Sequence, residues 1–209
     1  MATRQVPAIQ PAAATGAAVT TAAGERGAGL AEAVLALVAA IPDSDEAVSS
    51  QPEARARALA RTAARMTATV SGGAALAPGP LGLMTLLPDL LAVWRLQAQL
   101  VADIGAVYGK SASLGKEQML YCLFRHTAAH VVRDLVLRAG ERFVVRRASG
   151  ALLQKVAGAI GFKLAQRGLG KAFARYAPVV GAVAVAGYAY YDTTKVAATA
   201  MALFAQSAD

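Results

Sequence analysis

The chain is poor in charge, in aromatic residues and in cysteine. Of its 209 residues, 16% are charged, 6% are aromatic and 56% are hydrophobic. So apolar a composition excludes a mainly disordered chain. The single cysteine excludes an internal disulfide framework and is typical of a reducing compartment. Alternating strand patterns are also scarce, whereas alanine and leucine recur at helical spacing, so the sequence predicts an all-α fold.

Catalytic signatures are missing as well. The sequence contains no GxSxG, no GxxxxGK[ST], no HExxH and no second cysteine for a CxxC pair. We therefore predict no catalytic residue and no cofactor, and a function other than catalysis.

Helical periodicity and breakers divide the chain into a tail and one helical domain. Residues 1–27 are rich in Ala, Thr, Pro and Gly, and we predict a disordered N-terminal tail there. Residues 28–209 are expected to form a helical bundle of about six helices. The expected helices cover residues 30–41, 53–70, 88–107, 116–138, 151–167 and 171–204.

Two segments carry no charge at all. Residues 66–88 are long enough to cross the hydrocarbon of a membrane. They contain two helix-breaking sequences, however: Gly-Gly at 72–73 and Pro-Gly-Pro at 78–80. Residues 177–191 are also uncharged, and Pro178 is the second residue of this segment. Because proline and glycine weaken helices, we expect Gly/Pro-broken apolar hairpins that dip into a membrane or pack inside the bundle, and no single straight span.

The net charge of +8 is concentrated in one stretch. Residues 142–191 hold eight basic residues and no acidic one. Five of these basic residues repeat at multiples of four, with apolar residues between them: Lys155, Lys163, Arg167, Lys171 and Arg175. This pattern predicts a helix that lies on anionic membrane lipid. The alternative is a solvated face of a soluble bundle; nucleic acid is disfavoured because a recognisable reading element is missing.

Two polar rows on the expected helices are candidate sites. Arg95, Gln99 and Asp103 follow one another at four-residue steps on an apolar helix that also carries Asp89. Such a row predicts a structural polar seam or a ligand site, because buried charge needs partners.

A second row contains metal-ligand side chains. Cys122, His126 and His130 share one helix face at four-residue spacing, which is a possible zinc or iron ligand set. One helix cannot surround an ion by itself, so another ligand would be needed. The competing interpretation is a half-buried stripe with the cysteine in the core.

Two groups of segments resemble the bacterial EcsC family. The first comprises PGPLG at 78–82, LLPDLL at 86–91, RLQ at 95–97 and residues 104–109; the second comprises YAPVVGA at 176–182, residues 188–191 and Thr193-Thr194. The resemblance covers residues 55–205. It implies an α-helical, membrane-associated protein of the bacterial cytoplasmic side. The family takes its name from an operon that encodes an ABC transporter, has no agreed activity and offers no catalytic residues to transfer.

Together these features predict a protein associated with the inner face of the bacterial membrane. Its expected partners are anionic lipid and components of a transporter or secretion system. The alternative is a soluble helical bundle whose apolar cavity binds, or acts on, a lipid or isoprenoid.

Overall fold

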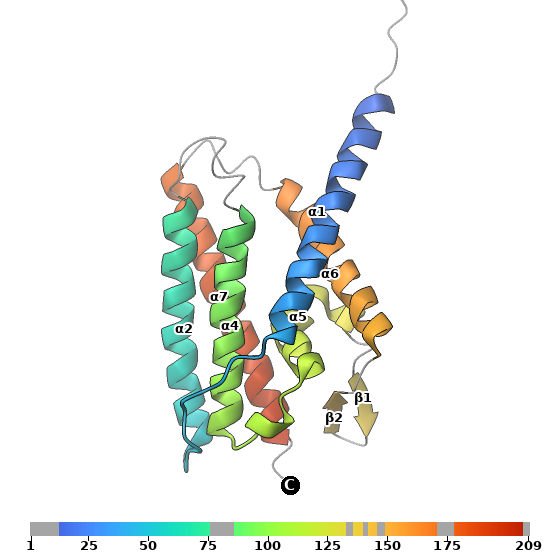
Figure 1. Cartoon of the computed structure of the whole chain (residues 1–209). Coiled ribbons are helices and arrows are strands. Elements are labelled where there is room, and N and C mark those ends of the chain that lie inside the picture. Colours follow the sequence, from blue (N-terminus) through green and yellow to red (C-terminus); the bar gives the residue numbers. More distant parts are fainter. Residues whose placement is uncertain are drawn as a thin grey trace, which may run out of the picture.

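The computed structural model of the chain describes residues 13–75, 86–132, 136–139, 142–145, 149–170 and 178–206. This part contains six α-helices, a short 3₁₀ helix and one two-stranded hairpin, which confirms the predicted all-α bundle (Figure 1). The elements are α1 (Ala13–Ala39), α2 (Pro52–Ala75), α4 (Leu86–Val107), η1 (Ser111–Ser113), α5 (Lys116–Val132), β1 (Val136–Ala139), β2 (Arg142–Val145), α6 (Gly150–Gly170) and α7 (Pro178–Gln206).

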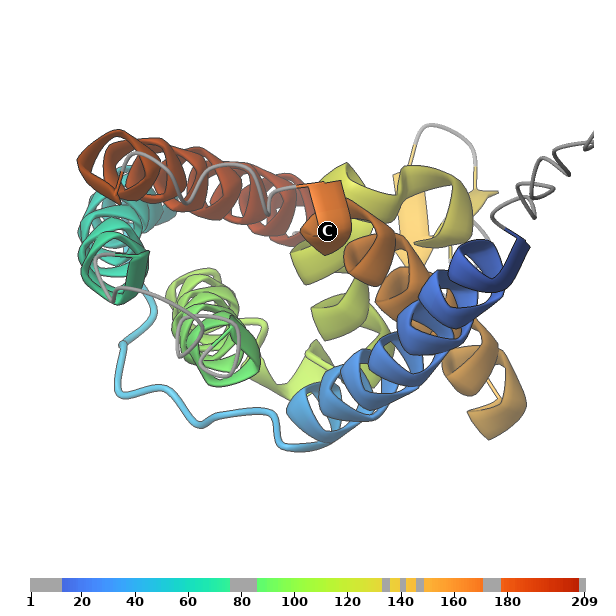
Figure 2. The ribbon, with the colours of Figure 1, turned by 90° about the horizontal axis from the view of Figure 1, so that it is seen from above.

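The helices form two packed groups. Helices α2, α4 and α7 lie side by side, and α1 crosses α6 on the other side of the molecule (Figures 1 and 2). Helix α5 lies between the groups and contacts α7 as well as α6. Seen from above, α2 and α7 form one edge of the bundle while α4 lies further in (Figure 2). The fold therefore presents the α2–α7 pair at its periphery.

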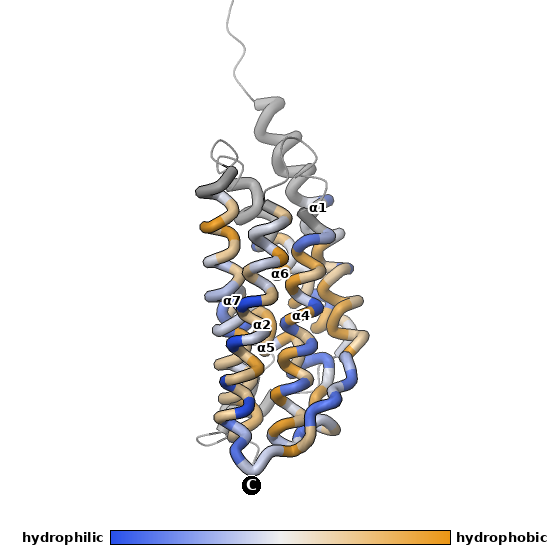
Figure 3. Tube along the Cα trace, turned by 90° about the vertical axis from the view of Figure 1, so that its left-hand side faces the viewer, coloured by the Kyte–Doolittle hydropathy of each residue, from blue (hydrophilic) through white to orange (hydrophobic). Residues whose placement is uncertain are grey.

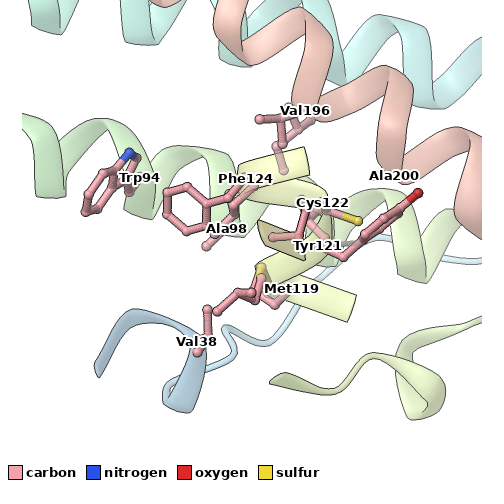
Figure 4. Close-up of a cluster of buried hydrophobic side chains, with 14 of the residues drawn as sticks. Val38, Trp94, Ala98, Met119, Tyr121, Cys122, Phe124, Val196 and Ala200 are labelled. Carbon is pink, nitrogen blue, oxygen red and sulfur yellow. The ribbon is translucent and has the colours of Figure 1, made fainter. Parts of the chain in front are cut away.

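Helix α4 supplies much of the core. Among the described residues, Pro88–Val107 is the one helical segment long and apolar enough to cross a membrane, yet 61% of it is buried inside the bundle. A buried core helix passes the same length and composition test. Its Trp94 packs edge to face on Phe124 of α5, with ring centroids 5.3 Å apart. Met119 and Cys122 of α5 and Val196 of α7 extend this cluster (Figure 4). Packing thus accounts for the apolarity of α4.

The helices that flank the first predicted apolar hairpin are described, and its turn is not. Helix α2 ends at Ala75, α4 begins at Leu86, and the two pack together. Residues 76–85, with the Pro-Gly-Pro sequence, lie outside the described residues, as do residues 171–177 between α6 and α7. All four helix ends that flank these segments lie at the same end of the bundle (Figure 1).

Two expectations about secondary structure require correction, and a third concerns the uncharged segment 177–191. From Pro178 onward this segment belongs to the continuous helix α7 and contains no hairpin. The helix predicted over 116–138 ends at Val132, and Val136–Ala139 forms a strand that pairs antiparallel with Arg142–Val145. Val, Leu and Phe on both sides of Gly140 favour this hairpin. The second correction concerns the tail: residues 13–27 are helical, because alanine has the highest helix propensity and outweighs the scattered Thr and Gly. Residues 1–12 lie outside the described residues.

The crossing of α1 and α6 depends on two glycines. A Cβ atom on Gly161 would overlap the carbonyl oxygen of Gly27 and lie 2.8 Å from the amide nitrogen of Ala31. A Cβ on Gly27 would lie 3.3 Å from the Cα of Phe162. The two backbones are therefore in direct contact.

Replacing Gly161 by alanine is expected to destabilise the fold. The backbone atoms that the new methyl group meets cannot move without separating α1 from α6, so we expect a loss of about 1–3 kcal/mol in the free energy of unfolding. Gly158 is the matched control, since nothing lies within 4 Å of its Cβ position. Gly158→Ala should leave stability unchanged or raise it by up to about 1 kcal/mol. Urea unfolding followed by circular dichroism measures both; equal effects would contradict the close crossing.

Candidate functional site

A buried polar network joins four helices at mid-height of the bundle. The side-chain amide of Gln97 on α4 donates to Asp192 Oδ2 (2.9 Å) and to Thr193 Oγ1 (3.1 Å) on α7. Thr193 Oγ1 lies 2.9 Å from the hydroxyl of Thr67 on α2. Asp192 Oδ1 lies 2.6 Å from Nε2 of His126 on α5. The network thus ties α7 to α2, α4 and α5.

The arrangement contains a histidine and a carboxylate that are each mostly buried. The His126 and Asp192 side chains are 18% and 14% exposed, and both carboxylate oxygens of Asp192 are engaged. His126 Nδ1 is buried and has no hydrogen-bond partner in the described part of the chain. In a low-dielectric interior such bonds are strong and direction-dependent. We therefore assign the network to fixing the register of α7 against its neighbours.

A recess of about 360 Å³ opens at the surface beside this network. It is lined by Arg125, His126 and Ala129 of α5 and by Lys195, Ala198 and Thr199 of α7. A second recess, of about 810 Å³, lies between the start of α2 and the end of α7, and Tyr108, Met201 and several alanines line it. Both recesses are open to solvent.

The contact between α2 and α7 is built from small residues. Thr67 Oγ1 approaches the carbonyl oxygen of Ala189 at 3.5 Å. A Cβ on Gly72 would lie 3.2 Å from the Cβ of Ala186. Ala182, Ala189 and Thr193 are buried on the facing side of α7. The uncharged segments of the two helices therefore pack on each other through their small side chains.

The large apolar residues of the same two segments point outward. Val183 is 69% exposed and Tyr191 is 56% exposed. The full set, here called the tip surface, consists of Met66, Val70, Val183, Tyr188, Tyr190 and Tyr191. In a water-soluble helix pair the large apolar side chains would be buried first. This end of the α2–α7 pair shows the reverse order.

The charged residues of α2 and α7 begin at the same height along the two packed helices. Thr67 pairs with Thr193; two residues before Thr67 is the exposed Arg65, and two residues after Thr193 is the exposed Lys195. From Met66 to Ala75, and from Pro178 to Tyr191, neither helix has a charged residue. Figure 3 shows the strongly hydrophilic positions of α2 in the lower part of that helix. The tip surface is therefore bordered by cations on the side that faces the rest of the bundle.

The predicted lipid-contacting lysines and arginines are only partly described. Lys155 is exposed on α6, and Lys163 is half-buried on the same helix. Arg167 also belongs to α6, but its side chain, together with Lys171 and Arg175, lies outside the described residues. Their contact with anionic lipid stays a prediction.

The predicted polar row on α4 divides into two parts. Gln99 donates to Asp103 Oδ1 at 2.9 Å and to the carbonyl oxygen of Asp43 at 2.9 Å. The Ser44 hydroxyl donates to the same Asp103 oxygen at 2.7 Å. These bonds hold the segment between α1 and α2 against α4. Arg95 is exposed and Asp89 is half-buried, and neither joins this seam.

The predicted metal ligands do not converge in the described part of the chain. Cys122 is completely buried in the core, and burial raises the pKa of its thiol to about 12. His126 binds Asp192, and the side chain of His130 lies outside the described residues. Among the side chains that are described, no group of three His, Cys, Asp or Glu could hold an ion. Metal binding at these three positions stays a prediction.

Cys122 is expected to resist thiol reagents in the folded protein. Only the thiolate reacts, and a raised pKa together with full burial keeps the group protonated and covered at neutral pH. Maleimide labelling should be slower by at least about a hundredfold than in concentrated guanidinium chloride, as followed by mass spectrometry. Rapid labelling of the native protein would show a thiol accessible enough to bind a metal.

The central residues of the buried network were not predicted from the sequence. Asp192 is the one acidic residue between positions 142 and 208, and Gln97 interrupts an apolar helix. A lone carboxylate in so apolar a segment needs a buried partner. The isolation of Asp192 in the sequence could therefore have marked it as part of a buried polar network. The partner His126 lies 66 residues away, so only the fold brings them together.

Comparison with known proteins identified no relative: no family model, no curated protein and no solved structure matches this chain.

Proposed function

We propose that this protein attaches reversibly to the anionic, cytoplasmic face of a bacterial membrane, as the resemblance to the EcsC family suggests. The tip surface carries this proposal: large apolar side chains point outward at the one place where the α2–α7 pair is uncharged. Contiguous exposed apolar residues are uncommon on soluble monomers and are characteristic of binding surfaces.

The packing of α2 on α7 supports a lipid environment in particular. Helices that associate in lipid place small residues between them and large apolar residues outside, because lipid offers no hydrophobic penalty for the latter. Thr67, Gly72, Ala182 and Ala186 occupy the inner positions, whereas Val70 and Val183 lie outside. Tyrosine is enriched at the boundary between lipid and water, and three tyrosines of α7 lie near the first charges.

The geometry supports shallow insertion. Met66–Ala75 spans about 14 Å at 1.5 Å per residue, about half the hydrocarbon thickness of a bilayer. Asp89 of α4 is half-buried about 12 Å above Gln97, at the height of the tip surface. The α4 side must therefore stay out of the hydrocarbon, and the protein enters by its α2–α7 edge to a depth of about 5–10 Å.

Cations supply the second part of the attachment. Arg65 and Lys195 border the tip surface, and Lys171 and Arg175, the last cations of the acid-free basic stretch, directly precede α7 in the sequence. Each basic residue near anionic lipid contributes about 1 kcal/mol. Attachment should therefore combine apolar insertion with attraction that depends on salt.

Co-sedimentation with vesicles tests the proposal. The full chain should pellet with phosphatidylcholine vesicles that contain phosphatidylglycerol, and binding should weaken with added salt and on pure phosphatidylcholine. Charge reversal of Lys163, Arg167, Lys171 and Arg175 should further reduce binding to the anionic vesicles. A chain that stays in the supernatant with both vesicle types would overturn the proposal.

A second candidate function is the binding of a lipid or isoprenoid in the larger recess. Its volume is about 810 Å³, and it is lined by Tyr108, Met201 and alanines together with the exposed Glu53 and Arg57. The apolar part of this lining would suit part of a lipid or isoprenoid chain. Native mass spectrometry of the purified protein tests this: a stoichiometric bound lipid supports it, and a ligand-free protein after extraction from cells contradicts it. The membrane proposal extends to a role alongside components of a transporter or secretion system.

A further inference from the structure

The smaller recess combines open space with two cations. The small side chains of Ala129 and Ala198 are part of its lining, and its volume of about 360 Å³ is within the range of small-ligand sites. Arg125 enters from α5 and Lys195 from α7, so the two charges approach it from different helices. Besides Lys195, the α7 residues that line the recess are the small Ala198 and Thr199.

Aromatic rings hold both cations. The guanidinium carbon of Arg125 lies 5.4 Å from the ring centre of Tyr121, and the ammonium nitrogen of Lys195 lies 5.1 Å from that of Tyr191. Such contacts restrict a long side chain without neutralising its charge. Each cation is therefore partly preorganised and remains available to an anion.

The nearby carboxylate does not neutralise these cations. Asp192 directs one oxygen to His126 and the other to Gln97, as described above. Within the described ranges, neither Arg125 nor Lys195 forms an ion pair with an acidic side chain. Among the described residues, a recess lined by two cations that form no ion pair favours an anionic ligand.

We infer that this recess binds a phosphate group, held by Arg125 and Lys195. A guanidinium can donate two parallel hydrogen bonds to phosphate oxygens, and an ammonium group adds a point charge. The phosphate can come from a phospholipid headgroup or from a free phosphate in solution. A phospholipid as the source rests on the proposed membrane attachment, since Lys195 lies one helical turn from Tyr191 of the tip surface. The binding of phosphate itself does not depend on that attachment.

Isothermal titration calorimetry on the full chain tests the site with two soluble probes, inorganic phosphate and glycerophosphoglycerol. Arg125→Gln and Lys195→Gln should each weaken binding at least about tenfold, as expected for loss of a charge-assisted bond. Lys195→Arg keeps the charge and should retain the affinity within about threefold. Arg61→Gln removes one exposed cation from α2 and is the matched control, with unchanged binding expected.

The results separate the source of the phosphate from the site itself. Tighter binding of glycerophosphoglycerol indicates the lipid headgroup, and equal or tighter binding of inorganic phosphate indicates a free phosphate. No saturable heat with either probe, or equal losses in Arg61→Gln and Lys195→Gln, would overturn the inference. Phosphate binding that persists when Val183→Glu and Tyr188→Glu abolish vesicle binding would show that this site stands apart from membrane attachment.

Discussion

Replacing Val183 and Tyr188 together by glutamate is expected to weaken binding to anionic vesicles by about a hundredfold. Both side chains are exposed on α7, at 69% and 48%, so most of their surface is open to a membrane. Two carboxylates placed in the boundary of lipid and water would lose their hydration and meet anionic headgroups. The loss corresponds to about 2.7 kcal/mol, and a vesicle titration monitored by sedimentation measures it.

Val48 offers a closely matched control. It is 72% exposed and lies beside Gly109, next to the end of α4 that is far from the tip surface. Val48→Glu adds one negative charge to an apolar site as exposed as Val183, so it is compared with the single variant Val183→Glu. Repulsion from the membrane by net charge alone would weaken binding equally in these two single variants. Similar losses in the two would mean that the tip surface is not the contact.

Replacing Asp192 by alanine is expected to cause the largest loss of stability. The change removes the partner of His126 and one of the two bonds of Gln97, and leaves both polar groups buried. Breaking a buried pair from one side costs about 3–5 kcal/mol. For a chain of this size that corresponds to a fall of about 10 °C in Tm. Thermal unfolding followed by circular dichroism measures it.

Asp45→Ala provides the comparison for that loss. Asp45 is an exposed carboxylate in the segment between α1 and α2, and its removal should change stability by less than about 0.5 kcal/mol. If Asp192→Ala is tolerated as well as Asp45→Ala, the network does not hold α7 in register.

Local sequence patterns were sufficient for most helices. Leu90, Val93, Trp94 and Leu100 recur at the spacing of a helix face, and Pro88 fits the first turn, so α4 was predictable almost to its ends. The same logic located the seam of Gln99 and Asp103, which lie four residues apart on that helix. Its third partner, Ser44, was not predictable because it comes from a loop 59 residues away.

Errors arose where two local preferences competed. Residues 133–145 have both apolar spacing compatible with a helix and strand-forming side chains about Gly140, and only the pairing of Val136 with Val145 decides between them. Residues 13–27 lack an apolar stripe, yet Gly27 gains a direct contact with Phe162 of α6. Strand pairing across Gly140 decided the first case. The helix propensity of alanine, together with the contact of Gly27 with α6, decided the second.

The candidate sites depended even more on the tertiary fold. Apolar composition identified the uncharged segments but not which of their residues face outward. That depends on the packing of Gly72 against Ala186, which turns Val70 and Val183 away from the contact. Similarly, Arg125 and Lys195 lie 70 positions apart in the sequence and share a recess only because α5 packs on α7.

A fluorescent label at position 183 tests most directly whether the tip surface enters lipid. Because Cys122 is buried, Val183→Cys and Val48→Cys can each be labelled selectively with an environment-sensitive dye. On addition of phosphatidylglycerol-containing vesicles, the dye at position 183 should shift to the blue and be quenched by brominated lipid, while the dye at position 48 should not change. An unchanged spectrum at position 183 in a protein that sediments with the vesicles would contradict insertion through α2 and α7.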